Sequence, residues 1–132
     1  MELIGLDTGF FLKLLEGKKE VVEVWEKVID GKLKAKTSSL VLFELKRILL
    51  KLGKSEIWND IKEAIVLNCD VVSVDLSIAE KGASVSYGTG LPAMDSLIYT
   101  CVSDVDVFYT TDGSFKVLSK KKKPKIRIFK AT

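Results

Sequence analysis

The sequence of 132 residues contains no histidine. Imidazole is the usual general base near neutral pH and the commonest metal-binding side chain in proteins. Its absence excludes a Ser-His-Asp hydrolase, a histidine-dependent ribonuclease and a histidine-ligated zinc hydrolase. Any catalysis by this chain must therefore rest on carboxylates.

Other absences narrow the class of protein. Glutamine is missing and asparagine is scarce beside many lysines and glutamates, a balance that resembles proteins of thermophiles. Cys69 and Cys101 lack the C-x-x-C spacing and lie among apolar residues, which predicts reduced thiols in a cytoplasmic protein. No apolar run is long enough to span a membrane and no signal segment opens the chain, so no membrane partner is expected.

The residues that are present predict a packed core. Apolar residues make up 47% of the chain and no Pro, Gly or Ser tract interrupts them, so we expect one folded domain. The net charge of only +3 gives no general attraction to nucleic acid. The lysine run at 120–125 could touch an RNA backbone, but a solvated loop that protects an edge strand is the simpler interpretation.

Strand and helix patterns alternate along the chain. The segments with strand character are residues 2–7, 32–37, 71–74, 107–109 and 126–129. The second and fifth of them alternate polar and apolar residues, which predicts half-exposed or edge strands. Strands that alternate with helices pair in parallel through right-handed crossovers. We therefore expect an α/β fold, a three-layer α/β/α sandwich around a mostly parallel five-stranded sheet.

The helical segments are residues 20–29, 40–52, 56–67, 76–85 and the stretch that Pro92 opens. The last is the clearest, because apolar residues recur there at helical spacing from Met94 to Val102. Ser55 and Asp75 are predicted N-caps. The glycines at 31 and 53 are predicted to end the helices before them.

Acids lie where this fold brings segments together. Asp7 follows the first predicted strand and Asp112 follows the fourth, so both lie at the carboxyl end of the sheet, where ligands bind. Asp95 falls in the first turn of a helix, and Glu44 lies beside an apolar stripe. Carboxylates gathered in one cleft repel each other unless a cation compensates them. A cluster rich in oxygen and free of histidine suits Mg²⁺ or Mn²⁺.

Each acid alone also has a structural explanation. Asp7 is placed to cap a helix, and Asp95 is placed to complement a helix dipole. Asp112 fits an Asp-Gly turn, and Glu44 fits a pair with Arg47 one turn later. Only the joint arrangement of the acids favours chemistry over these separate roles.

Short acid-containing motifs follow one another along the whole chain. They are IGLDT at 4–8, TSS at 37–39 with FEL at 43–45, LPAMDSLI at 91–98 and YTTDGSF at 109–115. No motif is specific alone, but their order resembles the PIN-domain family, and in particular the VapC-type toxins among its small members. By this resemblance residues 1–132 are a single PIN domain.

The resemblance implies a Mg²⁺- or Mn²⁺-dependent endoribonuclease, the toxin component of a VapBC-type toxin-antitoxin system. Its catalytic and metal-binding residues are Asp7, Glu44, Asp95 and Asp112, the last supporting the metal directly or through water. The residues that adjoin these acids and are predicted to fix the carboxylates or touch phosphate are Thr8, Ser96 and Thr111. Ser114 departs from the pattern, because many relatives carry a further acid at that position.

The resemblance also implies partners: an RNA substrate and, beside it, a VapB-like antitoxin. The apolar helices at 21–29 and 57–65 are explained first by core packing, and part of their surface is expected to form a homodimer or to receive an antitoxin helix.

Two alternative functions remain open, and two others are excluded because the residues that they require are missing. A catalytically silent PIN-like module that binds RNA or protein stays an alternative, as does a PIN nuclease of general RNA processing. A receiver domain needs an acidic pair after its first strand, and only Asp7 is there. A haloacid-dehalogenase-type phosphatase needs an acid where Gly9 lies.

Overall fold

The computed structural model describes residues 1–129. Its strands are β1 (Leu3–Leu6), β2 (Lys34–Ser38), β3 (Cys69–Val72), β4 (Val107–Thr110) and β5 (Lys125–Ile128). They form one sheet in the order β3-β2-β1-β4-β5, and every neighbouring pair is parallel. The prediction of a mostly parallel five-stranded sheet is confirmed.

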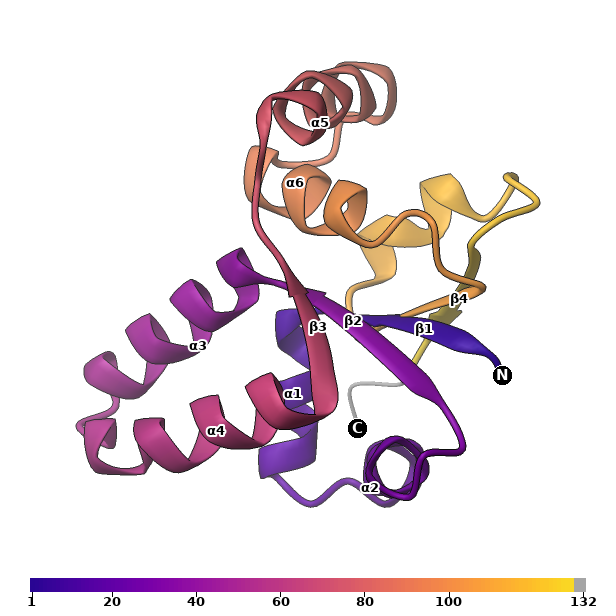
Figure 1. Cartoon of the computed structure of the whole chain (residues 1–132). Helices are drawn as coiled ribbons and strands as arrows, with labels where there is room; N and C mark the ends of the chain where they lie inside the picture. The colour runs from indigo at the N-terminus through magenta and orange to yellow at the C-terminus, as the bar shows by residue number, and fades with distance from the viewer. Residues whose placement is uncertain (130–132) are drawn as a thin grey trace.

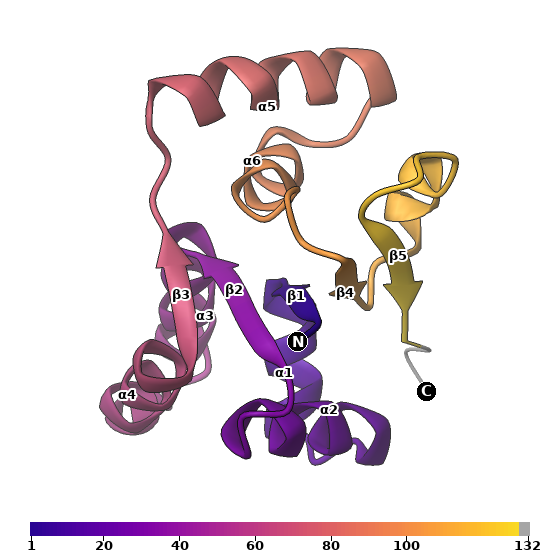
Figure 2. The same cartoon turned by 45° about the vertical axis from the view of Figure 1, so that its right-hand side comes forward.

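Helices cover both faces of this sheet (Figures 1 and 2). They are α1 (Thr8–Leu15), α2 (Lys19–Ile29), α3 (Ser39–Lys51), α4 (Trp58–Asn68), α5 (Leu76–Thr89) and α6 (Ala93–Cys101), with 3-10 segments η1 (Ser55–Ile57) and η2 (Gly113–Leu118). The first four helices pack their apolar side chains into one core, while α5, α6 and η2 contribute to a second core. The three-layer α/β/α prediction is therefore confirmed. No helix within residues 1–129 is both long and apolar enough to cross a membrane.

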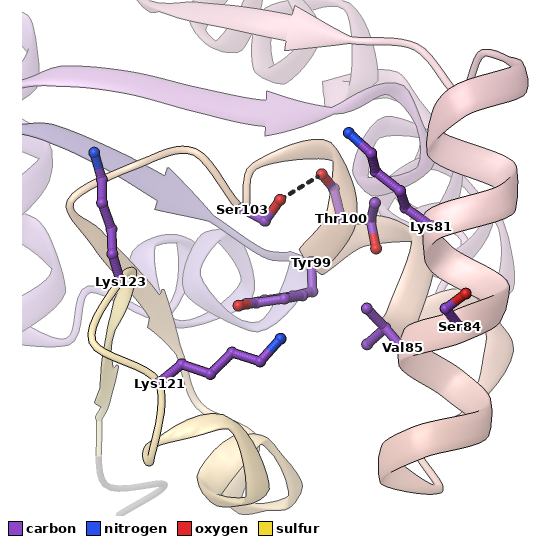
Figure 3. A pocket seen from close by; sticks show the side chains of 8 residues that line it. All are labelled: Lys81, Ser84, Val85, Tyr99, Thr100, Ser103, Lys121 and Lys123. Atoms are coloured by element: carbon purple, nitrogen blue, oxygen red, sulfur yellow. Dashed lines mark hydrogen bonds between the residues drawn. The ribbon is translucent and has the colours of Figure 1, made fainter.

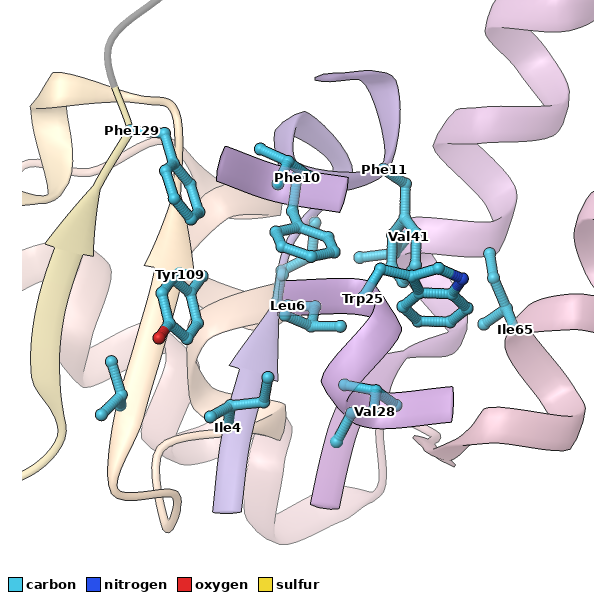
Figure 4. Close-up of a cluster of buried hydrophobic side chains, with 14 of the residues drawn as sticks. Ile4, Leu6, Phe10, Phe11, Trp25, Val28, Val41, Ile65, Tyr109 and Phe129 are labelled. Carbon is cyan, nitrogen blue, oxygen red and sulfur yellow. The ribbon is translucent and has the colours of Figure 1, made fainter. Parts of the chain in front are cut away.

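The two cores follow from the alternation of side chains along the central strands. In β1, Ile4 and Leu6 are fully buried in the core under α1 and α2, which Figure 4 shows around Phe10 and Trp25. Gly5 lies on the other face, where an added Cβ would come within 2.8 Å of Val102 Cγ2. The chain after α6 thus packs directly against the backbone of β1, and only glycine permits that approach.

The local predictions of helix caps and edge strands are confirmed in part. Asp75 caps α5 as predicted, accepting a hydrogen bond from the Ile78 amide at 2.8 Å, and the glycines at 31 and 53 follow the ends of α2 and α3. The N-cap predicted at Ser55 is wrong, because this residue begins η1 and its side chain makes no capping bond. The alternating segment at β2 lies inside the sheet, so the edges are β3 and β5.

The strand order defines one crevice. From β1 the chain moves outward to β2 and β3, and it then returns to place β4 on the opposite side of β1. In an open parallel sheet the ligand crevice lies where the order reverses, beyond the carboxyl ends of the strands. Here that point lies between the ends of β1 and β4.

Candidate functional site

The four predicted acids line one cavity of about 240 Å³ at this reversal point. Its lining residues are Asp7, Thr8, Gly9, Leu12, Glu44, Asp95, Ile98, Thr111, Asp112 and Phe115. Among residues 1–129, no lysine or arginine lines it. The acids arrive from the end of β1, from α3, from α6 and from the end of β4, so the fold alone brings them together. We call this space the acidic cavity.

Asp7 is the most enclosed acid, with 7% of its surface exposed. It caps α1, because its Oδ1 accepts a hydrogen bond from the Phe10 amide at 2.9 Å. Its Oδ2 accepts a hydrogen bond of 2.5 Å from the Thr110 hydroxyl. That hydroxyl oxygen in turn accepts a bond of 3.0 Å from the Asp112 amide. Thr110 therefore links the carboxylate of one acid to the backbone of another.

Glu44 is held by a different hydroxyl. Its Oε1 accepts a hydrogen bond from Thr8 Oγ1 at 2.6 Å, which ties α3 to the start of α1. The pair with Arg47 that would explain Glu44 structurally is not among the ion pairs of residues 1–129. The carboxylate thus faces the cavity on a fixed side chain.

Asp95 and Asp112 sit at the starts of helical segments. Asp95 lies half-buried in the first turn of α6. Asp112 precedes η2 and its Oδ1 accepts a hydrogen bond from the Ser114 amide at 2.9 Å. These structural roles are compatible with a shared site, since helix N-termini favour negative charge.

Repulsion between the acids affects the pKa values of Asp7 and Asp95. Burial raises the pKa of Asp7 to about 6, with repulsion from Asp95 and Asp112 adding to the rise and the bonds from Thr110 and Phe10 opposing it. Burial also raises the pKa of Asp95, and Asp112 and Glu44 raise it further. Within the described part of the chain, no lysine or arginine lines the acidic cavity to compensate these charges.

The supporting residues divide into three groups. Thr8 donates a hydrogen bond to Glu44, as predicted. Thr111 lines the cavity, and its hydroxyl lies so close to Gly9 that a side chain at position 9 would clash with it. Ser96 does not reach the cavity, because it is fully buried and its hydroxyl donates to the Leu91 carbonyl at 3.4 Å. Thr110 was not predicted. The Thr-Thr-Asp sequence signals a hydroxyl there, but only strand geometry tells which threonine faces Asp7.

The donor set fits a divalent cation in its chemistry. All the polar ligands offered are carboxylate or hydroxyl oxygens, which Mg²⁺ and Mn²⁺ prefer. Within residues 1–129, however, no group of three or more acidic or cysteine side chains is arranged to hold an ion directly. A metal here would therefore be bound by fewer carboxylates, with water completing its shell, as is usual for Mg²⁺.

The lysine run lies elsewhere. Lys121 and Lys123 line a separate pocket together with Lys81 of α5, beside Tyr99 and Thr100 near the end of α6 (Figure 3). None of the residues around this pocket lines the acidic cavity. The run is thus not part of the candidate site, in agreement with its interpretation as a loop before the last edge strand.

A comparison with family models decides the family. The model of the PIN domain matches residues 4–121. The chain belongs to the PIN-domain family. The matched range contains all four acids of the cavity, and the family predicted from the sequence motifs is confirmed.

Two solved structures share the fold. A toxin-antitoxin complex from Klebsiella pneumoniae superimposes with a TM-score of 0.69 at 13% identity, over 96% of this chain and 98% of that one. VapBC2 from Rickettsia felis, bound to a DNA fragment from its promoter, gives a TM-score of 0.74 at 13% identity, with the same coverage of 96% and 98%. No curated protein matches the chain in sequence.

Proposed function

We propose that this PIN domain is a metal-dependent endoribonuclease. The observation that carries the proposal is the convergence of four acids from distant segments on one cavity, which no lysine or arginine of residues 1–129 lines. Nuclease activity is general among PIN domains, and the acidic cavity lies where an open parallel sheet binds its ligand.

Asp7, Glu44, Asp95 and Asp112 are the residues that would hold Mg²⁺ or Mn²⁺, some of them directly and the others through water. When bound, such an ion lowers the pKa of a water molecule and offsets charge on the phosphate. The chain's own contribution is geometry. Thr8 fixes Glu44, and Thr110 fixes Asp7, so two of the carboxylates are oriented before any ligand arrives.

Replacing Asp95 by asparagine tests the proposal. We expect the native chain to cleave unstructured RNA with Mn²⁺ or Mg²⁺, and Asp95→Asn to reduce the rate by about 100-fold or more. Asp60→Asn is a matched control, because Asp60 also lies in the first turn of a helix but is exposed on α4. Equal cleavage by the native chain and Asp95→Asn would assign the activity to a contaminant and favour a catalytically silent RNA- or protein-binding module.

Thr110→Val is expected to lower activity by about 10- to 100-fold without removing any acid, because the loss of an orienting hydrogen bond frees the Asp7 carboxylate. Thr110→Ser keeps the hydroxyl and should restore most of the rate. Cleavage measured across a range of Mn²⁺ concentrations separates a weakened metal site from a slower reaction. Native rates for the valine variant at every concentration would remove the positioning role.

We also propose that the chain is the cytoplasmic toxin of a VapBC-type pair. The support is the fold shared with one toxin-antitoxin complex and with VapBC2. We expect expression of the chain to arrest growth, and co-expression of the adjacent open reading frame to relieve the arrest if it encodes a VapB-like DNA-binding antitoxin. Growth without arrest, and no such reading frame, would favour a PIN nuclease of general RNA processing.

A homodimer is part of the same proposal. The apolar residues of the helices at 21–29 and 57–65 lie mainly in the core. Val21, Trp25, Val28 and Ile65 are buried there. Apolar surface remains on α4, where Val66 is 55% and Leu67 is 74% exposed. Light scattering should give twice the 14.6 kDa mass of the chain, and a monomer would contradict the dimer.

A further inference from the structure

A groove of about 620 Å³ runs between α3 and the start of α4. Phe43, Lys46, Arg47 and Leu50 line it from α3, and Trp58 lines it from α4. We call it the α3 groove. It shares no lining residue with the acidic cavity, yet Glu44 of that cavity lies between groove residues in the sequence of the same helix.

The cations of the α3 groove have no ion-pair partner among the residues that the structure describes. Lys46 and Arg47 are exposed, and neither lies within 4.0 Å of a carboxylate in residues 1–129. Glu44 is the acid one turn before Arg47, but the two form no ion pair, and Oε1 of Glu44 accepts a hydrogen bond from Thr8 instead. Two positive charges therefore remain available on the helix that also carries Glu44, one of the acids of the acidic cavity.

The aromatic residues of the groove are accessible as well. Phe43 is 56% exposed although it lies on a well-formed helix, and Trp58 is half-buried across the groove. Phe43 and Arg47 are four residues apart, so they are neighbours on the helix surface. A ring beside a guanidinium and an ammonium is the combination that binds single-stranded nucleic acid, through base stacking and phosphate contacts.

We propose that the α3 groove binds a single-stranded RNA segment next to the phosphate that is cut. A base stacks on Phe43, and Arg47 and Lys46 contact the backbone. This inference rests on the proposed ribonuclease function and assigns residues outside the acidic cavity to holding its RNA. Self-association through the groove is disfavoured, because a two-fold interface would bring Lys46 and Arg47 of both copies together. RNA, by contrast, supplies the missing negative charge.

Binding measured without cleavage tests the proposal. In the Asp95→Asn background, fluorescence anisotropy follows a labelled polyuridine oligonucleotide, which is single-stranded. Phe43→Ala is expected to weaken its binding by about tenfold. Arg47→Ala is expected to weaken binding and to reduce the slope of log K against log salt by about 0.7, the value for one phosphate contact with a single strand.

Matched controls separate the groove from general charge. Lys121→Ala removes the same charge from the separate lysine pocket and should leave the affinity unchanged. A duplex of matched length should bind equally to the parent and to Phe43→Ala, because paired bases cannot stack on the ring. Thermal melting checks that each variant is folded, which is expected because Phe43 and Arg47 are exposed.

The outcomes for the groove and for the nuclease are distinguishable. Parental affinity in both groove variants overturns the RNA subsite, even if the native chain cleaves RNA. Weaker binding in both variants supports the subsite, even if the native chain proves inactive. If the variants bind RNA normally but lose self-association or an antitoxin, the groove is a protein interface and the proposal is wrong.

Discussion

Asp7→Asn is expected to abolish RNA cleavage and to stabilise the metal-free protein at about pH 8 by up to about 3 kcal/mol. The two effects have one cause. The Asp7 carboxylate is buried, and its pKa is about 6 instead of the ordinary 3.8. Its charge is therefore unfavourable in the folded protein when no cation is bound, and a neutral amide removes that cost together with the metal ligand. Because the amide nitrogen cannot accept one of the two hydrogen bonds that the carboxylate accepts from Phe10 and Thr110, the figure of about 3 kcal/mol is an upper bound.

The sign of this effect depends on pH. Because the folded-state pKa of Asp7 is raised, its contribution to stability is complete below about pH 4 and is lost as the pH rises through about 6. The gain from asparagine should therefore be present at about pH 8 and absent at about pH 4. Denaturant unfolding in the presence of a chelator, at both pH values, measures the difference.

Asp75→Asn is the matched control for this measurement. Asp75 caps α5 with nearly the same backbone angles as Asp7 and a similar bond to an amide, but it is exposed. Asparagine caps helices about as well as aspartate, so Asp75→Asn should leave the stability nearly unchanged. A destabilised Asp7→Asn protein at about pH 8 would show that the carboxylate charge is not the unfavourable element.

Mn²⁺ added to the metal-free protein is expected to raise the melting temperature by several degrees at about pH 8, and much less at about pH 5. A metal must displace protons from carboxylates whose pKa values are raised, as those of Asp7 and Asp95 are. An ion present at 100 times its Kd stabilises the protein by about 2.7 kcal/mol. The chain has no histidine, so the carboxylates with raised pKa values are the side chains that change charge between these pH values.

Differential scanning fluorimetry with Mn²⁺ and with a chelator, at equal ionic strength, measures this shift. Equal ionic strength matters because salt alone screens the repulsion between the acids. The shift should be much smaller in Asp7→Asn and in Asp95→Asn. The same shift at both pH values, or in both variants, would place the ion outside the acidic cavity.

The sequence contains enough information to place the acids. Asp7 and Asp112 follow strands, and parallel strands carry their ends to one edge of the sheet, so their meeting could be predicted. Asp95 could be placed because Pro92 marks the start of its helix. The partner of Glu44 is the hardest to predict, because a residue beside an apolar stripe can contact either its own helix or the helix packed against it. Only the packing of α3 on α1 makes Thr8 its partner and not Arg47.

Other features depend on packing that no local pattern records. The range of α1 could not be predicted, although Asp7 is placed to cap a helix, because the near-continuous apolar run between Phe10 and Leu15 hides the helical spacing. Ser96 has the right neighbour in sequence, but a turn of helix directs its hydroxyl to a backbone carbonyl. No local pattern shows that Thr110 and not Thr111 contacts Asp7. Which of the two threonines faces Asp7 depends on how β4 lies beside β1.

The pairing of β1 with β4 also sets when the acidic cavity can first be completed during synthesis. Ile4 pairs with Val107, so the central strand waits for a neighbour that is translated about a hundred residues later. Parallel pairing over such a separation is slow, because the chain must close a long loop first. A nascent chain that has not yet reached Asp112 carries three of the acids on an unfinished sheet. For the ribonuclease proposed above, a product truncated before β4 lacks Asp112 and is therefore expected to be inactive.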